Sequence, residues 1–204
     1  MERIVVFTEP VSPITEAYRG LCTNVLAELG EKKAIEIASV SANADASVVV
    51  ANLAVAMAQT TKRVLLVDCN FRKPNQHTLF GLLNRGLSEC IETSESFTSF
   101  VQETAQRNLQ VLTAGSTVLN PVEILLSDAM QNILNDTKAS YDVVLLDAPV
   151  IDTVSDAVTF GVRTDGVLLV LADKEDKMEQ ALKVKESFIQ AGVEILGCIL
   201  NKVK

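Results

Sequence analysis

The chain alternates between short, unbroken apolar runs and longer stretches in which apolar and polar residues recur with helical spacing. Such apolar runs predict strands buried on both faces, and the stretches between them predict helices. The expected strands are Arg3–Thr8, Ile35–Val40, Arg63–Cys69, Leu109–Thr113, Asp142–Asp147, Gly166–Leu171 and Ile195–Asn201. The expected helices are Glu16–Leu29, one starting near Ala46, a short one within Asn70–Gly86, one within Leu87–Arg107, Val122–Lys138, Ser155–Arg163 and Lys177–Gln190. Thr15 is the expected N-cap of the first helix and Gly30 its end.

Strands that alternate with helices through short loops predict an α/β fold. We expect a doubly wound, mostly parallel sheet with helices on both faces, formed by residues 1–204 as a single domain. The composition agrees, because 48% of the residues are hydrophobic but only 4% are aromatic. An aliphatic core of this kind is typical of parallel sheets covered by helices.

Ala34–Gln59 is the stretch around which this fold is organised. It predicts a buried strand, a polar turn at residues 41–47 and an apolar helix, the unit that holds phosphates in nucleotide-binding α/β proteins. The turn contains neither glycine nor lysine, and glycine is absent between Gly30 and Gly81. The architecture of a phosphate site is therefore predicted without its usual chemistry.

Polar side chains follow the expected strands at Ser41–Ser47, Asp68–Arg72, Asp147–Asp152 and Asn201. Ligands of such sheets bind at the carboxyl ends of the strands, so these residues are the candidate site. Asp147 has the position of the metal-supporting aspartate of P-loop nucleotide hydrolases, and Asp68 ends a second strand of the same kind. Two carboxylates there suit Mg²⁺ support and general-base work. The plainer interpretation is that each caps the turn that follows its strand.

Charge and composition exclude several function classes. A net charge of −8 and an isoelectric point near 4.7 argue against a nucleic-acid-binding surface. The single histidine, His77, leaves little for a histidine metal site or a catalytic triad. The cysteines lack metal-site spacing and are expected to be reduced thiols, at positions Cys22, Cys69, Cys90 and Cys198. No signal peptide or membrane span is predicted, so we expect a cytoplasmic protein that docks at the membrane only through a partner.

Several motifs resemble the bacterial tyrosine kinases (BY-kinases) of capsule and exopolysaccharide synthesis. They are SPITEAYR at 12–19, ANLA at 51–54 with AQ at 58–59, VLLVDCNFRKPNQH at 64–77, GLS at 86–88, AG at 114–115, NPVEIL at 120–125, YDVVLLDAP at 141–149 with DA at 156–157, and GCILN at 197–201. The resemblance covers nearly the whole chain. It implies the MinD/ParA-like deviant Walker fold, ATP and Mg²⁺ as ligands, tyrosine phosphorylation, and work with a membrane protein that controls polysaccharide chain length.

The family's phosphate loop reads roughly PGEGKS/T, and this chain departs from it. Counting back from residues 51–53 places Ala46 at the lysine, Asp45 at the preceding glycine and Ser47 at the Mg²⁺-binding hydroxyl. The missing lysine removes a charge-assisted phosphate contact worth roughly 1.5–3 kcal/mol. We expect the Asp45 side chain, or that of Asn43, to cap the following helix and fill the anion site itself.

Other family positions have changed in the same direction. Asn70 stands where the second aspartate is expected, and asparagine is no general base. Glu16 and Arg19 of the family's ExxRxxR oligomerisation motif are kept, but Cys22 replaces the second arginine, which should weaken a homo-oligomer. The sequence ends at Lys204 without the family's tyrosine-rich tail, and its only tyrosines are Tyr18 and Tyr141.

The remaining candidates each have two interpretations. Asn201 matches the position at which related folds recognise adenine, or it is simply a turn residue at a strand end. Arg72, Lys73 and His77 match residues that shape the family's active-site rim, or they form a solvated basic loop.

Two functional hypotheses follow from the resemblance and its departures. The first is a pseudokinase without a nucleotide cofactor that regulates or scaffolds exopolysaccharide production. It would bind the cytoplasmic segment of a membrane chain-length protein, an active kinase paralogue, or both. The second is an active ATP- and Mg²⁺-dependent kinase or ATPase in which a lysine from elsewhere in the chain, such as Lys73, or from a neighbouring subunit supplies the missing charge. A third, binding of a non-nucleotide anion or sugar phosphate at the same rim, has only the retained carboxylates in its favour.

Overall fold

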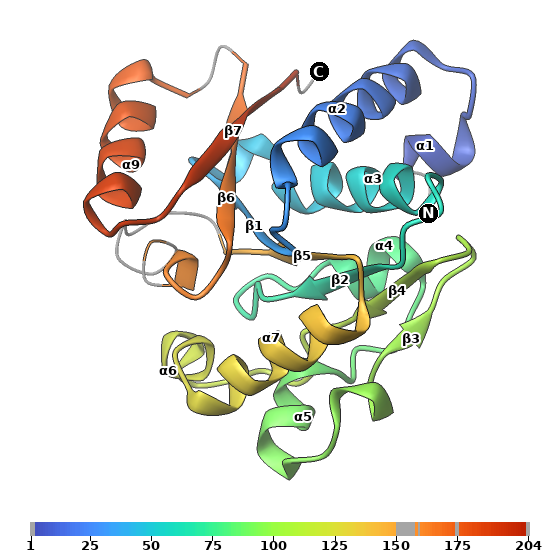
Figure 1. Ribbon diagram of the computed structural model, residues 1–204, viewed down its shortest axis with the longest axis vertical. Helices are drawn as coiled ribbons and strands as arrows, with labels where there is room; N and C mark the ends of the chain where they lie inside the picture. Colours follow the sequence, from blue (N-terminus) through green and yellow to red (C-terminus); the bar gives the residue numbers. More distant parts are fainter. Residues whose placement is uncertain (1–2, 150–157, 159, 174–175, 203–204) are drawn as a thin grey trace.

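The computed structural model describes residues 3–149, 158, 160–173 and 176–202. A parallel sheet with helices on both of its faces forms the body of the protein (Figure 1). The strands are β1 Ala34–Ser39, β2 Val64–Asp68, β3 Gln102–Glu103, β4 Leu109–Leu112, β5 Val143–Asp147, β6 Gly166–Ala172 and β7 Ile195–Asn201. The helices are α1 Val5–Thr8, α2 Pro13–Leu29, α3 Ala46–Ala58, α4 Gln76–Phe80, α5 Leu87–Thr93, α6 Pro121–Leu125, α7 Asp128–Ser140 and α9 Met178–Gln190, with 3₁₀ turns η1 Ala42–Ala44 and η2 Phe97–Ser99.

Within the described residues the strand order is β3-β4-β2-β5-β1-β6-β7. All neighbours are parallel except β3, which runs antiparallel to β4 at one edge. After β1 the chain builds the sheet in one direction, and after β5 it crosses β1 and builds in the other. The predicted doubly wound α/β architecture is confirmed, and its switch point lies between the carboxyl ends of β1 and β5.

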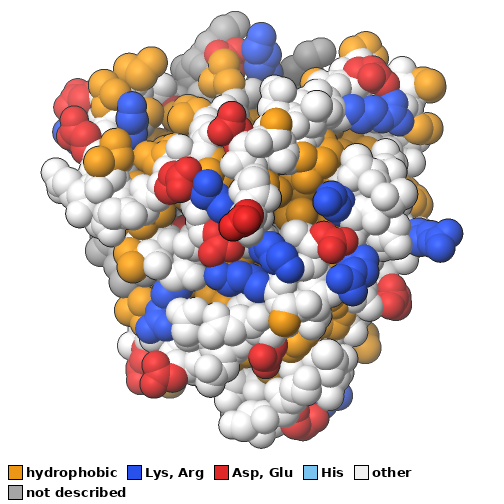
Figure 2. Space-filling view, in the orientation of Figure 1, with side chains coloured by type: hydrophobic (Ala, Val, Ile, Leu, Met, Phe, Trp, Pro, Cys, Tyr) orange, Lys and Arg blue, Asp and Glu red, His pale blue; other side chains and the backbone are white. Residues whose placement is uncertain are grey.

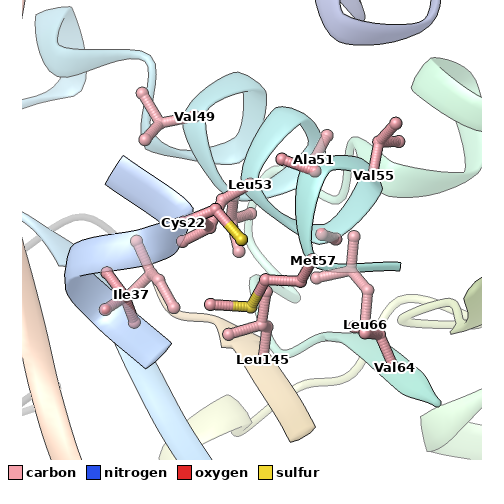
Figure 3. Packing of buried hydrophobic residues seen from close by; sticks show 14 of the residues in the cluster. Cys22, Ile37, Val49, Ala51, Leu53, Val55, Met57, Val64, Leu66 and Leu145 are labelled. Atoms are coloured by element: carbon pink, nitrogen blue, oxygen red, sulfur yellow. The ribbon is translucent and has the colours of Figure 1, made fainter. Parts of the chain in front are cut away.

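Successive side chains of each strand point to opposite faces, and separate apolar clusters cover the two faces. One cluster packs under α2 and α3 and includes Ile37, Leu66 and Leu145 (Figure 3). The other face packs against α7 on one side and against α9 on the other. Helix α3 is buried on nearly every side, because α1 and α2 cover its outer surface. The stretch that carries the candidate phosphate loop is therefore the most enclosed helix among those described.

The predicted N-terminal strand is wrong. Within Arg3–Thr8 the chain forms no strand but the short helix α1, Val5–Thr8, because backbone groups of this segment find partners on a helix rather than on a sheet edge. The side-chain amide of Asn52, buried in α3, accepts the N–H of Val6 and donates to the carbonyl of Arg3. The first long helix also begins earlier than expected. Ser12 is its N-cap, whereas the Thr15 hydroxyl donates to the carbonyls of Val5 and Glu9.

Two other expected helices are divided. The stretch from Val122 to Lys138 breaks into α6 and α7, because the Ser127 hydroxyl accepts the N–H of Met130 and caps a new helix. Leu87–Arg107 contains α5, η2 and the edge strand β3. Of the expected helix at Ser155–Arg163, residues 155–157 and 159 lie outside the described residues, as do Asp152 and the DA motif at 156–157.

None of the helices in the described part of the chain combines the length and the apolar character needed to cross a bilayer.

On the face shown in Figure 2, basic and acidic side chains are interspersed and do not form separate positive and negative patches.

Candidate nucleotide site

The carboxyl ends of β2 and β5 bring the two predicted aspartates together. Asp68 lies directly opposite Asp147 in the parallel register, and both side chains are fully buried. Ile37 of β1 is the neighbour of Asp147 on its other side, so Asp147 borders the switch point of the sheet and Asp68 lies one strand away from it. The sequence therefore predicted correctly that these strand ends converge at one rim.

Asp68 is held by backbone N–H groups of the loop that follows it. Its Oδ1 accepts from Asn70 N at 3.1 Å, and its Oδ2 accepts from Asn75 N and Gln76 N, each at 3.0 Å. Burial raises the pKa of Asp68 to about 6, although these three hydrogen bonds act to lower it. Both of its oxygens are thus engaged in shaping the turn before α4, as the plainer interpretation proposed.

Asp147 has one engaged and one open oxygen. Its Oδ2 accepts from the side-chain Nε2 of Gln76 at 2.6 Å, and its Oδ1 is buried without a hydrogen-bond partner. Burial, followed by the charge of Asp68, raises the pKa of Asp147 to about 8, while the side chains of Gln76 and Ser47 act to lower it. Simultaneous ionisation of two carboxyl groups so close together is unfavourable in a site that excludes water.

The candidate phosphate loop passes through η1 and reaches α3 at Asp45, whose backbone is left-handed at φ 49° and ψ 40°. This conformation favours glycine, the residue that the family resemblance places here. Aspartate adopts it more readily than most other residues do. The loop therefore has a backbone suited to glycine and the side chain of an aspartate.

The expected cap by Asp45 is wrong. An N-cap side chain reaches the N–H groups of the first turn from an extended backbone, which the left-handed conformation of Asp45 does not provide. Its carboxylate instead pairs with the Nη2 of Arg3 at 2.5 Å. Only its main-chain carbonyl serves the helix, accepting from the N–H groups of Val48 and Val49. The alternative cap, Asn43, lies within η1.

A cavity of about 330 Å³ opens between this loop and the residues that follow β2. Its lining is polar and consists of Ser39, Asp45, Ala46, Ser47, Asn70, Lys73, Pro74, Asn75 and Ala148. Lys73 brings a positive charge to the cavity, as the second hypothesis requires. Neither Arg72 nor His77 belongs to this lining as the described residues form it.

Asn201 is tied to the loop through its side-chain nitrogen, and it also lines a second cavity, of about 730 Å³, between α2 and β7. Its Nδ2 donates to the carbonyl of Ala44 at 3.0 Å, which fastens η1 to the end of β7. On α2, Glu16 and Arg19 form an exposed ion pair with each other. Cys22 is buried against α3 and faces the core (Figure 3). The thiol at this position therefore contributes to packing and presents no group to another subunit.

Sequence reasoning missed three residues that organise the site: Arg3, Asn52 and Gln76. Asn52 left a detectable signal, because an amide inside an otherwise apolar helix needs buried partners. Arg3 and Gln76 gave none, since their partners lie far away in the sequence.

The residues present fit a Mg²⁺–nucleotide complex poorly in the arrangement described. Mg²⁺ with a nucleotide takes one or two protein oxygens and completes its octahedral shell with phosphate oxygens and waters. Both oxygens of Asp68 and one of Asp147 already accept hydrogen bonds, which leaves one carboxylate oxygen and the Ser47 hydroxyl. The part of the chain that the structure describes contains no group of three or more His, Cys, Asp or Glu residues suited to a metal ion. Ala46 offers no charge to the phosphates.

Residues 33–189 match the AAA domain family. The tyrosine-protein kinase YwqD of Bacillus subtilis (strain 168) is 37% identical over 204 residues, spanning 98% of this chain and 86% of that protein. The crystal structure of the chimerical protein CapA2B2 superposes with a TM-score of 0.92 at 33% identity, covering 100% of this chain and 91% of that one. The septum site-determining protein MinD of Pyrococcus horikoshii OT3, solved with Mg-ADP, shares the fold with a TM-score of 0.71 at 24% identity, covering 83% of this chain and 70% of that one.

Proposed function

The chain belongs to the bacterial tyrosine-protein kinase (BY-kinase) family, and we propose that within this family it is a pseudokinase. In this proposal it retains the fold, binds nucleotide weakly or not at all, and acts as a regulatory or scaffolding partner in exopolysaccharide or capsule production. Its partners are the cytoplasmic segment of a membrane chain-length protein, an active kinase paralogue, or both. It then works in the cytoplasm, at the inner face of the membrane through that partner.

The observation that carries the proposal is the pair Asp45–Ala46 at the start of α3. The lysine position holds a methyl group, so a charge-assisted phosphate contact of roughly 1.5–3 kcal/mol is missing. The glycine position holds a carboxylate that is ion-paired with Arg3 at the mouth of the cavity. Both differences act against a polyphosphate, and the Asn70 amide in place of a second carboxylate weakens general-base catalysis as well.

Calorimetric titration of the protein with Mg-ATP and with Mg-ADP tests the proposal. We expect no binding in the micromolar range, whereas YwqD in the same buffer serves as the positive control. Micromolar affinity for either nucleotide would overturn it. A binding titration is preferred to an activity assay, because a kinase that lacks its activator also shows no turnover.

One observation favours a second candidate, an active enzyme with an atypical loop. Lys73 lines the cavity from the loop after β2 and brings to it the kind of charge that Ala46 lacks. This candidate predicts phosphotyrosine formation or phosphate release in the presence of the membrane partner. The activity should disappear in Lys73→Ala, Asp68→Ala and Asp147→Ala alike. Absence of turnover with Mg²⁺ and with Mn²⁺, partner included, would rule it out.

A further inference from the structure

Gln76, the first residue of α4, connects three parts of the candidate site. Its backbone N–H donates to Oδ2 of Asp68 at 3.0 Å. Its side-chain Nε2 donates to Oδ2 of Asp147 at 2.6 Å and to the main-chain carbonyl of Ser47 at 3.0 Å. The side chain is fully buried. One residue therefore joins the ends of β2 and β5 to the first turn of α3.

The orientation of the Gln76 amide follows from its partners. A primary amide has two N–H donors on nitrogen and only acceptor lone pairs on oxygen. Both neighbours, the Asp147 carboxyl and the Ser47 carbonyl, present acceptor oxygens, so the nitrogen must face them. The amide oxygen then points away and is buried without a hydrogen-bond partner among the described residues. This unpaired acceptor is costly, and the two donor contacts offset that cost.

We infer that the amide of Gln76 takes the place of a divalent cation at Asp147. The inference rests on the proposed function, since it explains how a member of this family keeps its site assembled without Mg²⁺-nucleotide. Asp147 is a residue that the family resemblance assigns to metal support, whereas Ser47, whose hydroxyl has that assignment, is contacted by Gln76 only through its main-chain carbonyl. One amide N–H presents the positive end of a dipole to Oδ2 of Asp147, as a bound cation would present its charge to a carboxyl oxygen. The amide also fastens the first turn of α3, which nucleotide would otherwise hold.

Two consequences distinguish this role from simple packing. First, the amide engages Oδ2 of Asp147 in the native protein and the open Oδ1 is fully buried, so divalent cations should neither bind there nor raise the melting temperature. Second, removing the donors while keeping the volume frees Oδ2 of Asp147 beside its open Oδ1. The freed carboxylate, with Asp68 next to it, should then bind a divalent cation at least about tenfold more tightly, because hard cations take carboxylate oxygens as ligands.

Mn²⁺ alone is the probe, and binding is followed by electron paramagnetic resonance of the free ion. The native protein should have no Mn²⁺ site that depends on Asp147, so Asp147→Asn should leave its Mn²⁺ binding unchanged. Gln76→Met should gain a Mn²⁺ site. Asn75→Ala is the matched control, because it removes the side-chain amide next to Gln76 in the sequence, which lines the cavity, and leaves the contact between Gln76 and Asp147 in place. A native Mn²⁺ site that depends on Asp147 would overturn the inference. A folded Gln76→Met protein without any gain would overturn it too.

Gln76→Glu provides a second readout that does not depend on the folding of Gln76→Met. A carboxyl group of the same size there adds a third acid and removes the donors. Its melting temperature should be low in EDTA and should rise with Mg²⁺, while the native melting temperature stays unchanged. Failure of Mg²⁺ to raise it would contradict a cation-like role. These measurements contain no nucleotide, so they can fail while the nucleotide titration still supports the proposed function, and the converse also holds.

Discussion

Restoring the two changed residues of the phosphate loop should restore nucleotide binding. The double substitution Asp45→Gly and Ala46→Lys returns the glycine and lysine of the family pattern to a backbone that already has the left-handed turn. The cavity beside this loop and the Ser47 hydroxyl are in place. If the side chains rather than the loop path are the cause of weak binding, two substitutions are sufficient for a measurable gain.

The expected gain follows from the contacts of the loop. A lysine at position 46 supplies a charge-assisted contact of roughly 1.5–3 kcal/mol, which corresponds to about 10- to 150-fold in affinity at about 1.4 kcal/mol per tenfold. Folding should change little. Replacing Asp45 with glycine relieves about 1 kcal/mol of left-handed strain but adds a similar entropy cost. It also removes an ion pair with Arg3 that is partly exposed and worth about 1 kcal/mol or less.

The assay is a calorimetric titration of four proteins with Mg-ATP: native, Asp45→Gly, Ala46→Lys and the double variant. Ala46→Lys alone should gain less than the double variant, because the Asp45 carboxylate remains at the mouth of the cavity. Thermal melts of all four check that the fold is retained. If the folded double variant binds no better than the native protein, the loop side chains do not account for the loss, and the block by Gln76 becomes the more direct cause.

The remaining predictions concern the stability of the fold. Burial raises the pKa of Glu36, whose side chain has no hydrogen-bond partner, well above its usual range. The folded state then holds the proton more tightly than the unfolded chain, so stability should fall as pH rises above about 4.3. Glu36→Gln should flatten that fall in urea titrations, and an unchanged slope would contradict an ionisable origin. Ser127→Ala should cost about 0.5–2 kcal/mol by removing the cap that starts α7. Ser140→Ala, whose hydroxyl donates to a carbonyl in the exposed last turn, should cost less, and equal losses would refute a capping role. Leu53→Ala, at a fully buried position of α3, should cost about 2–5 kcal/mol in chemical denaturation, and a loss below 1 kcal/mol would mean that the site collapses around the gap.

The sheet and the rim were predictable because their signals are local. The apolar run that ends in Asp68 and the one that ends in Asp147 each reveal a buried parallel strand and its carboxyl end. Their convergence then follows from topology alone. The N-terminal segment failed because Arg3–Thr8 has strand-forming residues but finds its backbone partners on Asn52, a contact across the fold that no periodicity reveals.

The details of the site were less predictable for a related reason. The negative charge and the position of Asp45 were visible in the sequence, but its backbone angles were not. These angles turn the side chain away from the helix end. Ser127 was overlooked as a cap because the apolar spacing continues across it. Gln76 could not be identified, since an amide in a polar loop has no pattern that marks it as buried.

The loop before α3 and the first turn of α3 are fastened by side chains from distant parts of the chain. Arg3 comes from the amino-terminal segment, Gln76 from the start of α4, and Asn201 from the end of the last strand. A pull or push on either end of the described chain is therefore transmitted to this loop through a hydrogen bond or an ion pair. A partner that binds the amino-terminal segment or β7 would shift the loop without entering the cavity. For the same reason, a fusion tag at either end should disturb this loop more than a tag on a surface that does not contact the loop.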